Sequence, residues 1–131
     1  MMNDLISLQR SNTILYCRNW KETVFFYKKH LCFPIAFENE WFVEFKLTDT
    51  SFLSIANSAR ATISAVQGQG VTLTWEVGQL ETVKEHLEMQ GVATTPITHK
   101  WGAFAFYCAD PEGHRLEFWT KDNRNGSRQD E

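Results

Sequence analysis

The 131-residue sequence predicts an α+β fold of two tandem βαβββ modules, whose strands form a curved mixed sheet around an open trough. The first observation is an internal duplication, because the order strand, helix and three strands occurs over residues 12–57 and again over residues 70–120. The second is period-two alternation of apolar and polar residues, as over residues 41–47, which predicts strands with one buried face. The third is one segment of helical apolar spacing in each half.

The first module begins with a strand over residues 12–17 and continues into a helix. Asn19 is expected to cap this helix, with Glu22 three residues later completing a capping box. Helical apolar spacing extends to Leu31, and Pro34 disfavours helix at the residue before it. Three short strands are expected next, over residues 34–38, 41–47 and 51–57.

The second module repeats this order. A strand over residues 70–77 precedes a helix over residues 80–91, where Gly91 serves as a C-cap. Between the last strands lies Asp110–Pro111–Glu112–Gly113, a tight turn in which Pro111 fixes φ and Gly113 takes a positive φ. The remaining segments are three extended runs at 92–98, 101–109 and 114–120, an N-terminal extension at 1–11, a linker at 58–69 and a polar tail at 121–131.

The composition excludes several classes of function. The net charge is −3 and no basic run exceeds two residues, which weighs against nucleic acid as a partner. No apolar segment approaches the roughly 20 residues of a membrane span, and the start has no signal-peptide core, so a cytoplasmic location is expected. The three cysteines are far apart and form no C-x-x-C pair, which predicts free thiols.

The strand after the turn carries one carboxylate, Glu117, inside an apolar run. Burying an unpaired charge is costly, so Glu117 must reach solvent, a partner or a ligand. Alternation directs Leu116 and Phe118 toward the helix, and therefore directs Arg115, Glu117 and Trp119 toward the trough.

Two segments resemble the vicinal oxygen chelate superfamily, the group of glyoxalases, bleomycin resistance proteins and dioxygenases. NWKETVFFYKKHLCF, residues 19–33, is similar to the D-L-x-x-S-x-x-F-Y-x-x-x-L-G-F run of its members, with Cys32 where glycine is usual. WGAFAFYCADPEGHRLEF, residues 101–118, is similar to the run that ends their second half. The resemblance covers residues 12–120 and implies the fold, but it does not imply one function, because the superfamily includes many chemistries.

In metal-using members of this superfamily, the ligands come from the first and last strand of each module. The resemblance places these positions on Asn12, Ser54, Gly70 and Glu117, and a shift of one residue adds only Gln69. Catalytic zinc, iron or nickel normally needs two or three His or carboxylate ligands, so no cofactor is expected. The alternative is a weak divalent-metal site of Glu117 with Asn12 or Gln69. His30, His86, His99 and His114 are interpreted as solvated surface residues.

The resemblance also implies which residues line the trough, because alternate residues of each strand share a face with the ligand positions. The expected ligand-binding residues are Asn12, Tyr16, Phe52, Ser54, Thr72, Thr74, Trp101, Arg115 and Trp119. The residues then directed to the helix side are Leu15, Leu53, Ile55, Leu73 and Trp75. Trp101 is expected either at the pocket rim, where it can stack on a flat ligand, or in the core. Glu44 is interpreted as part of a solvated edge.

Glu117 has three open roles. It can pair with a cationic ligand, or it can act catalytically as a general base if desolvation raises its pKa. Its structural role would be an ion pair with Arg115 or Lys46, or a hydrogen bond to Thr72 or Tyr16.

Two functions from different classes follow. The first is metal-free binding of a small aromatic or cationic compound by a homodimer of the bleomycin-resistance type, since related proteins pair their modules across subunits. The second is a metal-dependent lyase, isomerase or dioxygenase with a weak site centred on Glu117. A third possibility is an interaction module that binds no small ligand.

Overall fold

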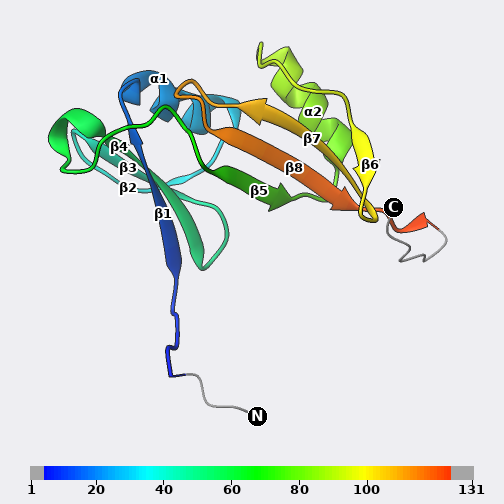
Figure 1. The fold of residues 1–131 in the computed structure, drawn as a ribbon, viewed down its shortest axis with the longest axis horizontal. Helices are drawn as coiled ribbons and strands as arrows, with labels where there is room; N and C mark the ends of the chain where they lie inside the picture. Colours follow the sequence, from blue (N-terminus) through cyan, green and yellow to red (C-terminus); the bar gives the residue numbers. More distant parts are fainter. Residues whose placement is uncertain (1–4, 125–131) are drawn as a thin grey trace. The chain divides into compact units, whose positions relative to one another are not determined.

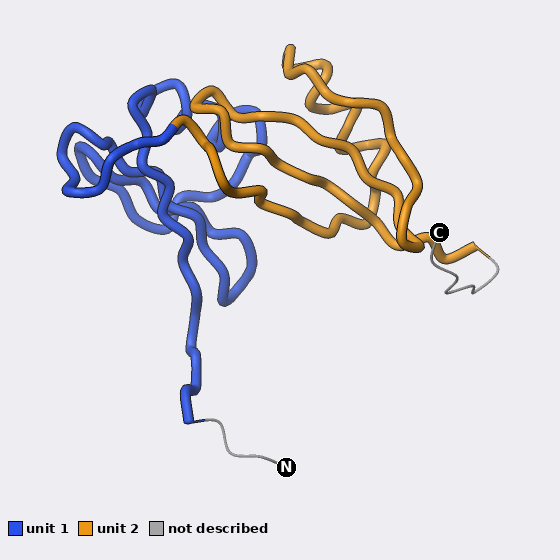
Figure 2. Tube along the Cα trace, viewed as in Figure 1, with its two compact units in different colours: residues 1–66 blue, residues 67–131 orange. Residues whose placement is uncertain are grey.

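The computed structural model describes residues 5–124, and the chain divides into two compact units, residues 1–66 and residues 67–131 (Figures 1 and 2). Each unit holds one four-stranded mixed sheet and follows the order strand, helix and three strands, which confirms the predicted α+β class of tandem βαβββ modules. The outermost parts of the predicted extension and tail, residues 1–4 and 125–131, lie outside the described residues. No helix in the described range is long and apolar enough to cross a membrane.

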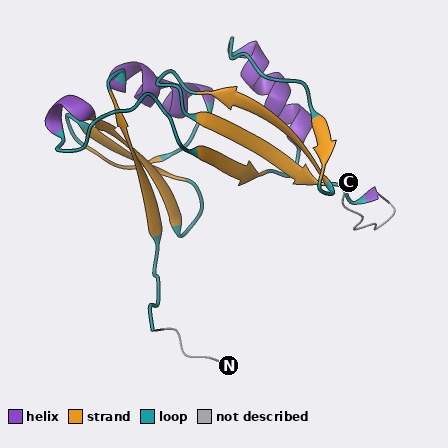
Figure 3. Ribbon diagram, in the orientation of Figure 1, coloured by secondary structure: helices purple, strands orange, loops and turns teal. Residues whose placement is uncertain are grey.

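Unit 1 holds a sheet with the strand order β1-β4-β3-β2, in which β1 runs parallel to β4 and the other neighbours are antiparallel. Its helix contacts β1 and β4. Figure 3 draws the strands of both sheets in orange and the helices in purple. Alternate strand residues fill the core beneath the helix, and the predicted helix-side residues Leu15, Leu53 and Ile55 are all buried. The elements are β1 (Ser11–Cys17), α1 (Trp20–Phe25), a π-helical segment (Phe26–His30), β2 (Ile35–Glu38), β3 (Phe42–Lys46) and β4 (Ser51–Asn57).

The helix of unit 1 differs from the sequence expectation at both ends. Asn19 is the N-cap residue, but its side chain makes no capping hydrogen bond, so the predicted capping box is wrong. Instead the Thr23 backbone N–H and hydroxyl both donate to the Asn19 carbonyl, at 3.0 and 2.7 Å. After Phe25 the helix widens into a π-helical segment that buries the consecutive residues Phe26 and Tyr27.

Cys32 follows this segment with φ = 61°, in the left-handed region. A residue with a Cβ pays roughly 1–2 kcal/mol there, whereas glycine does not. Its thiol is exposed and lies 3.5 Å from the Lys29 carbonyl oxygen. The backbone therefore adopts at Cys32 a conformation that suits glycine better than cysteine.

Replacing Cys32 by glycine is expected to raise the free energy of unfolding by about 1 kcal/mol, because it removes the strained Cβ. Urea unfolding followed by circular dichroism measures this change. Cys32→Ala is the control, since it removes the thiol and keeps the Cβ. If Cys32→Gly were no more stable than Cys32→Ala, the claim of backbone strain at residue 32 would be wrong.

Unit 2 repeats the arrangement with the strand order β5-β8-β7-β6, in which β5 runs parallel to β8. Its helix packs against β7 and β8. The core includes the buried side chains of Leu87, Phe106, Leu116 and Phe118. The elements are β5 (Thr72–Glu76), α2 (Leu80–Met89), β6 (Thr98–Lys100), β7 (Ala103–Ala109) and β8 (Arg115–Lys121).

The edge strand β6 shares only Thr98 with the extended run expected over residues 92–98, so the expected bounds of this strand are wrong. Pro96 has no N–H to offer a neighbouring strand, and the regular ladder stops at the pair Thr98–Ala105. Before β6, Thr95 forms two hydrogen bonds with Tyr107 of β7. The Thr95 N–H donates to the Tyr107 carbonyl at 2.9 Å, and the Tyr107 N–H donates at 2.8 Å to the Thr95 hydroxyl, where a regular strand pair would use a backbone carbonyl.

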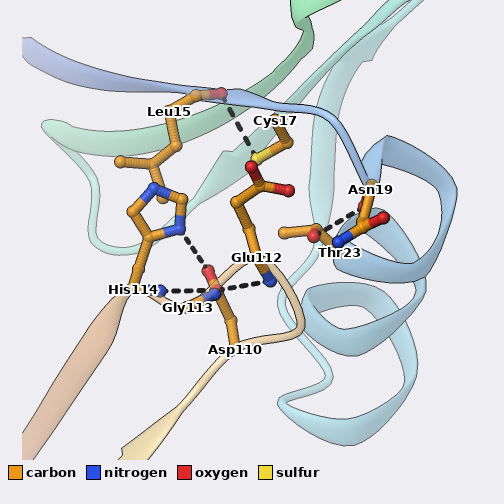
Figure 4. Close-up of polar contacts among 8 residues, drawn as sticks. All are labelled: Leu15, Cys17, Asn19, Thr23, Asp110, Glu112, Gly113 and His114. Carbon is orange, nitrogen blue, oxygen red and sulfur yellow. Dashed lines mark hydrogen bonds and ion pairs between the residues drawn. The ribbon is translucent and has the colours of Figure 1, made fainter. Parts of the chain in front are cut away.

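The turn between β7 and β8 is organised by Asp110 (Figure 4). Its Oδ1 accepts hydrogen bonds from the backbone N–H groups of Glu112, Gly113 and His114, at 3.0, 2.9 and 2.9 Å. Its Oδ2 lies 2.8 Å from Nδ1 of His114. Gly113 has φ = 109°, as the turn prediction requires. His114 is only 4% exposed, so its interpretation as a surface residue is wrong, because the Asp110 carboxylate supplies it with a buried partner.

Candidate functional site

Glu117 lies in β8 at the centre of the unit 2 sheet, with β5 on one side and β7 on the other. The strand registers place it opposite Thr74 and opposite Tyr107. Its Oε1 accepts a short hydrogen bond from the Thr74 hydroxyl, and its Oε2 accepts one from the Tyr107 hydroxyl at 3.0 Å. Side chains on the two neighbouring strands thus provide hydrogen bonds to both oxygens of this mid-strand carboxylate.

These partners differ from the structural partners that the sequence suggests. Arg115 does not pair with Glu117. Its Nε donates to the Thr72 hydroxyl at 2.9 Å, and its guanidinium lies 4.7 Å from the centre of the Tyr107 ring. Arg115 and Thr72 are therefore hydrogen-bonded to each other across β8 and β5, two residues before the pair formed by Glu117 and Thr74.

The charge of the Glu117 carboxylate has no ionic counterpart among residues 5–124, since both of its partners are hydroxyl groups. The hydrogen bond to Glu117 raises the pKa of the Tyr107 hydroxyl above its usual value, and burial raises it further. Tyr107 therefore stays protonated and acts as a donor. A negative group held by neutral donors can still attract a cation.

A pocket of about 650 Å³ opens on this face of the sheet. Its volume falls within the usual range for small-molecule sites. Ala105 pairs with Trp119 across β7 and β8, and this small residue leaves space beside the indole ring. Three lining residues contribute aromatic rings, Glu117 contributes a carboxylate and Lys100 contributes an ammonium group. The lining residues are Thr74, Thr98, Lys100, Trp101, Ala103, Ala105, Tyr107, Glu117 and Trp119.

Trp101 occupies an unusual backbone conformation at the edge of this pocket. Trp101 and Gly102 form the two-residue loop between β6 and β7, and both have positive φ, 60° and 72°. Positive φ at both positions is the pattern of a type I′ turn, which favours Asn-Gly and disfavours a bulky first residue. Trp101 is 69% exposed, so the core alternative for it is wrong. Trp101 therefore combines a strained backbone conformation with a largely exposed indole ring.

Trp101→Asn is expected to raise the free energy of unfolding by about 1 kcal/mol, because it creates the favoured Asn-Gly turn. Thermal and urea unfolding measure the change. Trp101→Ala is the matched control, since it removes the ring but keeps a Cβ-bearing residue in the left-handed region. Equal stability of the two variants would show that the turn is unstrained.

Four further expected site residues, Asn12, Tyr16, Phe52 and Ser54, lie on the sheet of unit 1. Ser54 is fully buried, and its hydroxyl donates to Oδ1 of Asn12 at 2.9 Å. Phe52 lies beneath the Arg10 guanidinium, 3.8 Å from the ring centre, and Tyr16 is half-buried. Arg10 also forms a 2.7 Å ion pair with Glu44, whose side chain is 14% exposed. Glu44 is therefore not a solvated edge residue, because Arg10 neutralises it.

The structure gathers four of the expected residues, Thr74, Trp101, Glu117 and Trp119, in one pocket. It leaves Thr72 and Arg115 outside the lining. Sequence reasoning missed Tyr107 and Lys100. Tyr107 could have been found by counting back from Glu117 across the Asp110–Gly113 turn, which places these two residues opposite each other.

The donor set does not fit the metal centre that the superfamily uses. Within residues 5–124, no three His, Cys, Asp or Glu side chains gather in a way that could hold a metal ion. Gly70 and Gln69 precede β5, and the residue of β5 that faces Glu117 is Thr74. Both oxygens of Glu117 already accept hydroxyl hydrogen bonds.

Comparison with known proteins defines the class. A family model for the Glyoxalase/Bleomycin resistance protein/Dioxygenase superfamily matches residues 10–118, and the chain belongs to this superfamily. No curated protein matches the sequence.

Solved structures show the same fold at low identity. A glyoxalase/bleomycin resistance protein/dioxygenase from Nocardioides has a TM-score of 0.76 and 17% identity, covering 98% of this chain and 91% of its own. The antibiotic binding protein TnmS3 from Streptomyces sp. CB03234 has a TM-score of 0.75 and 13% identity, covering 91% and 99%. A lactoylglutathione lyase from Agrobacterium tumefaciens has a TM-score of 0.70 and 14% identity, covering 95% and 99%.

Proposed function

We propose that this protein binds a small aromatic compound that carries a positive charge, in the pocket on the unit 2 sheet. The observation that carries the proposal is the Glu117 carboxylate, which lines a pocket with aromatic walls and has no ion pair within residues 5–124. Lys100 lines the same pocket but forms no ion pair with Glu117, and a cationic N–H group of a ligand would supply a counter-charge at this carboxylate. The antibiotic binding protein with the same fold supports a binding role at the level of the fold.

The aromatic side chains account for the flat part of the ligand. Trp119 lies on the same strand and the same face as Glu117, two residues away. Trp101 lines the pocket from the β6–β7 turn with its indole largely exposed. Stacking on such rings, with a cation near their faces, adds to the attraction of the carboxylate.

The proposal includes the absence of a resident metal. A metal-dependent lyase, isomerase or dioxygenase needs at least one strong ligand beside Glu117, and the residues nearest to its carboxylate are Thr74 and Tyr107. We therefore give Glu117 the role of a binding carboxylate rather than of a metal ligand. We also propose a cytoplasmic homodimer, which the resemblance to proteins that pair modules across subunits supports.

Proflavine, a flat aromatic cation, serves as the probe. Fluorescence titration is expected to show binding to the wild-type protein and roughly 10- to 150-fold weaker binding to Glu117→Gln, because a charge-assisted hydrogen bond contributes roughly 1.5–3 kcal/mol. Glu76→Gln is the matched control. Glu76 lies in β5, its side chain is 49% exposed, and it is not part of the pocket lining. Absence of proflavine binding, or equal losses in the two variants, would contradict the proposal.

Removal of metal is expected to leave this binding unchanged. Elemental analysis of the purified protein, followed by proflavine titration after dialysis against EDTA, makes the measurement. Glu117→Gln, analysed in parallel, shows whether any metal found depends on that carboxylate. Stoichiometric metal that disappears in Glu117→Gln would replace the binding proposal with the metal-dependent enzyme.

A further inference from the structure

The turn that carries Trp101 is held by the segment that follows β8. The backbone N–H of Asp122 donates to the Gly102 carbonyl at 2.9 Å. Lys121, the residue before it, pairs with Ala103 at the start of β7. Figure 1 shows the end of β8 beside the β6–β7 turn. The strained Trp101–Gly102 loop therefore has a fixed contact outside its own hairpin.

The Asp122 side chain joins this segment to β6. Its Oδ2 lies 2.8 Å from Nε2 of His99, and its carboxylate accepts two hydrogen bonds from the Arg124 guanidinium, at 2.9 and 3.0 Å. The His99 ring lies against the ring of Phe104, with centroids 4.6 Å apart, and the Arg124 guanidinium lies 5.0 Å from the centre of the same ring. The Asp122 side chain is only 13% exposed, so these contacts form a compact cluster, the Asp122 clamp.

The Asp122 clamp lies on the side of the hairpin away from the pocket. His99 and Phe104 are paired across β6 and β7, and they alternate with Thr98, Lys100, Ala103 and Ala105, which line the pocket. Asp122, His99 and Arg124 are not part of the pocket lining. The clamp therefore does not touch a ligand in this pocket and acts on it through the β6–β7 hairpin and its turn. Hydrogen bonding from Arg124 lowers the pKa of Asp122, so its carboxylate stays ionised near neutral pH.

We propose that Asp122 is a positioning residue, which holds the Trp101–Gly102 turn so that the Trp101 indole faces the pocket. This inference rests on the proposed function, because it concerns how that pocket binds its ligand. The physical reason is the positive φ of Trp101, a conformation that a bulky residue leaves unless its surroundings hold it. Loss of the clamp allows the turn to relax and the indole to move away from the pocket.

A double-mutant cycle with proflavine tests the coupling. Trp101→Ala and Asp122→Ala are each expected to weaken binding, by about two- to tenfold for the loss of an aromatic stack and by about threefold for its misplacement. In the Trp101→Ala background, Asp122→Ala is expected to cause no further loss. A full additional loss in that background, or no loss from Asp122→Ala alone, would overturn the proposal.

A second measurement needs no ligand. The indole N–H peak of Trp101 in the ¹H–¹⁵N spectrum, assigned by its disappearance in Trp101→Ala, is expected to shift in Asp122→Ala and to shift less in Asp122→Asn. Asp49→Ala is the control, because Asp49 is an exposed aspartate in unit 1 that pairs with Lys46 at 3.4 Å. An unchanged Trp101 peak in a folded Asp122→Ala protein overturns the positioning role. Absence of proflavine binding to the wild type would instead refute the proposed function and leave this spectral result to stand alone.

Discussion

The Asp110 carboxylate is the constraint on which the site depends. It satisfies three consecutive backbone N–H groups and the ring of His114, so the turn between β7 and β8 has one defined geometry. That geometry fixes the antiparallel register, which places Tyr107 opposite Glu117. A slip of one residue would turn Glu117 toward the helix and bury its charge without partners. The pocket chemistry is therefore set by a side chain that does not line the pocket.

The duplicated architecture carries different chemistry in each unit. In unit 1, Ser54 occupies the position that Glu117 occupies in unit 2, and its partner across the antiparallel pair is Glu44, where unit 2 has Tyr107. The unit 1 carboxylate is neutralised by Arg10, whereas Glu117 receives only hydroxyl groups. The same sheet topology thus carries an ion-paired carboxylate in unit 1 and, in unit 2, a carboxylate held by hydroxyl groups.

The sequence predicted the features that follow from short-range pattern. Alternation and the turn residues predicted the strands of both modules except the edge strand β6, and they directed Glu117 away from the helix. Leu15, Leu53 and Ile55 are buried as expected, whereas Leu73 and Trp75 are half-buried. The burial of His114 was missed because it depends on the two oxygens of Asp110, which no periodicity reveals. The π-helical segment and the conformation of Trp101 were missed for a related reason. Both depend on local hydrogen-bond geometry that apolar spacing leaves open.

A crystal structure of the protein with proflavine tests most directly whether Glu117 binds a cationic aromatic ligand. We expect the acridine in the unit 2 pocket, with one of its N–H groups at hydrogen-bond distance from Glu117 and its rings against Trp101 or Trp119. Glu117 would keep its hydrogen bonds to Thr74 and Tyr107. Proflavine bound elsewhere, with the pocket empty and Glu117 untouched, would contradict the claim that this carboxylate selects the ligand.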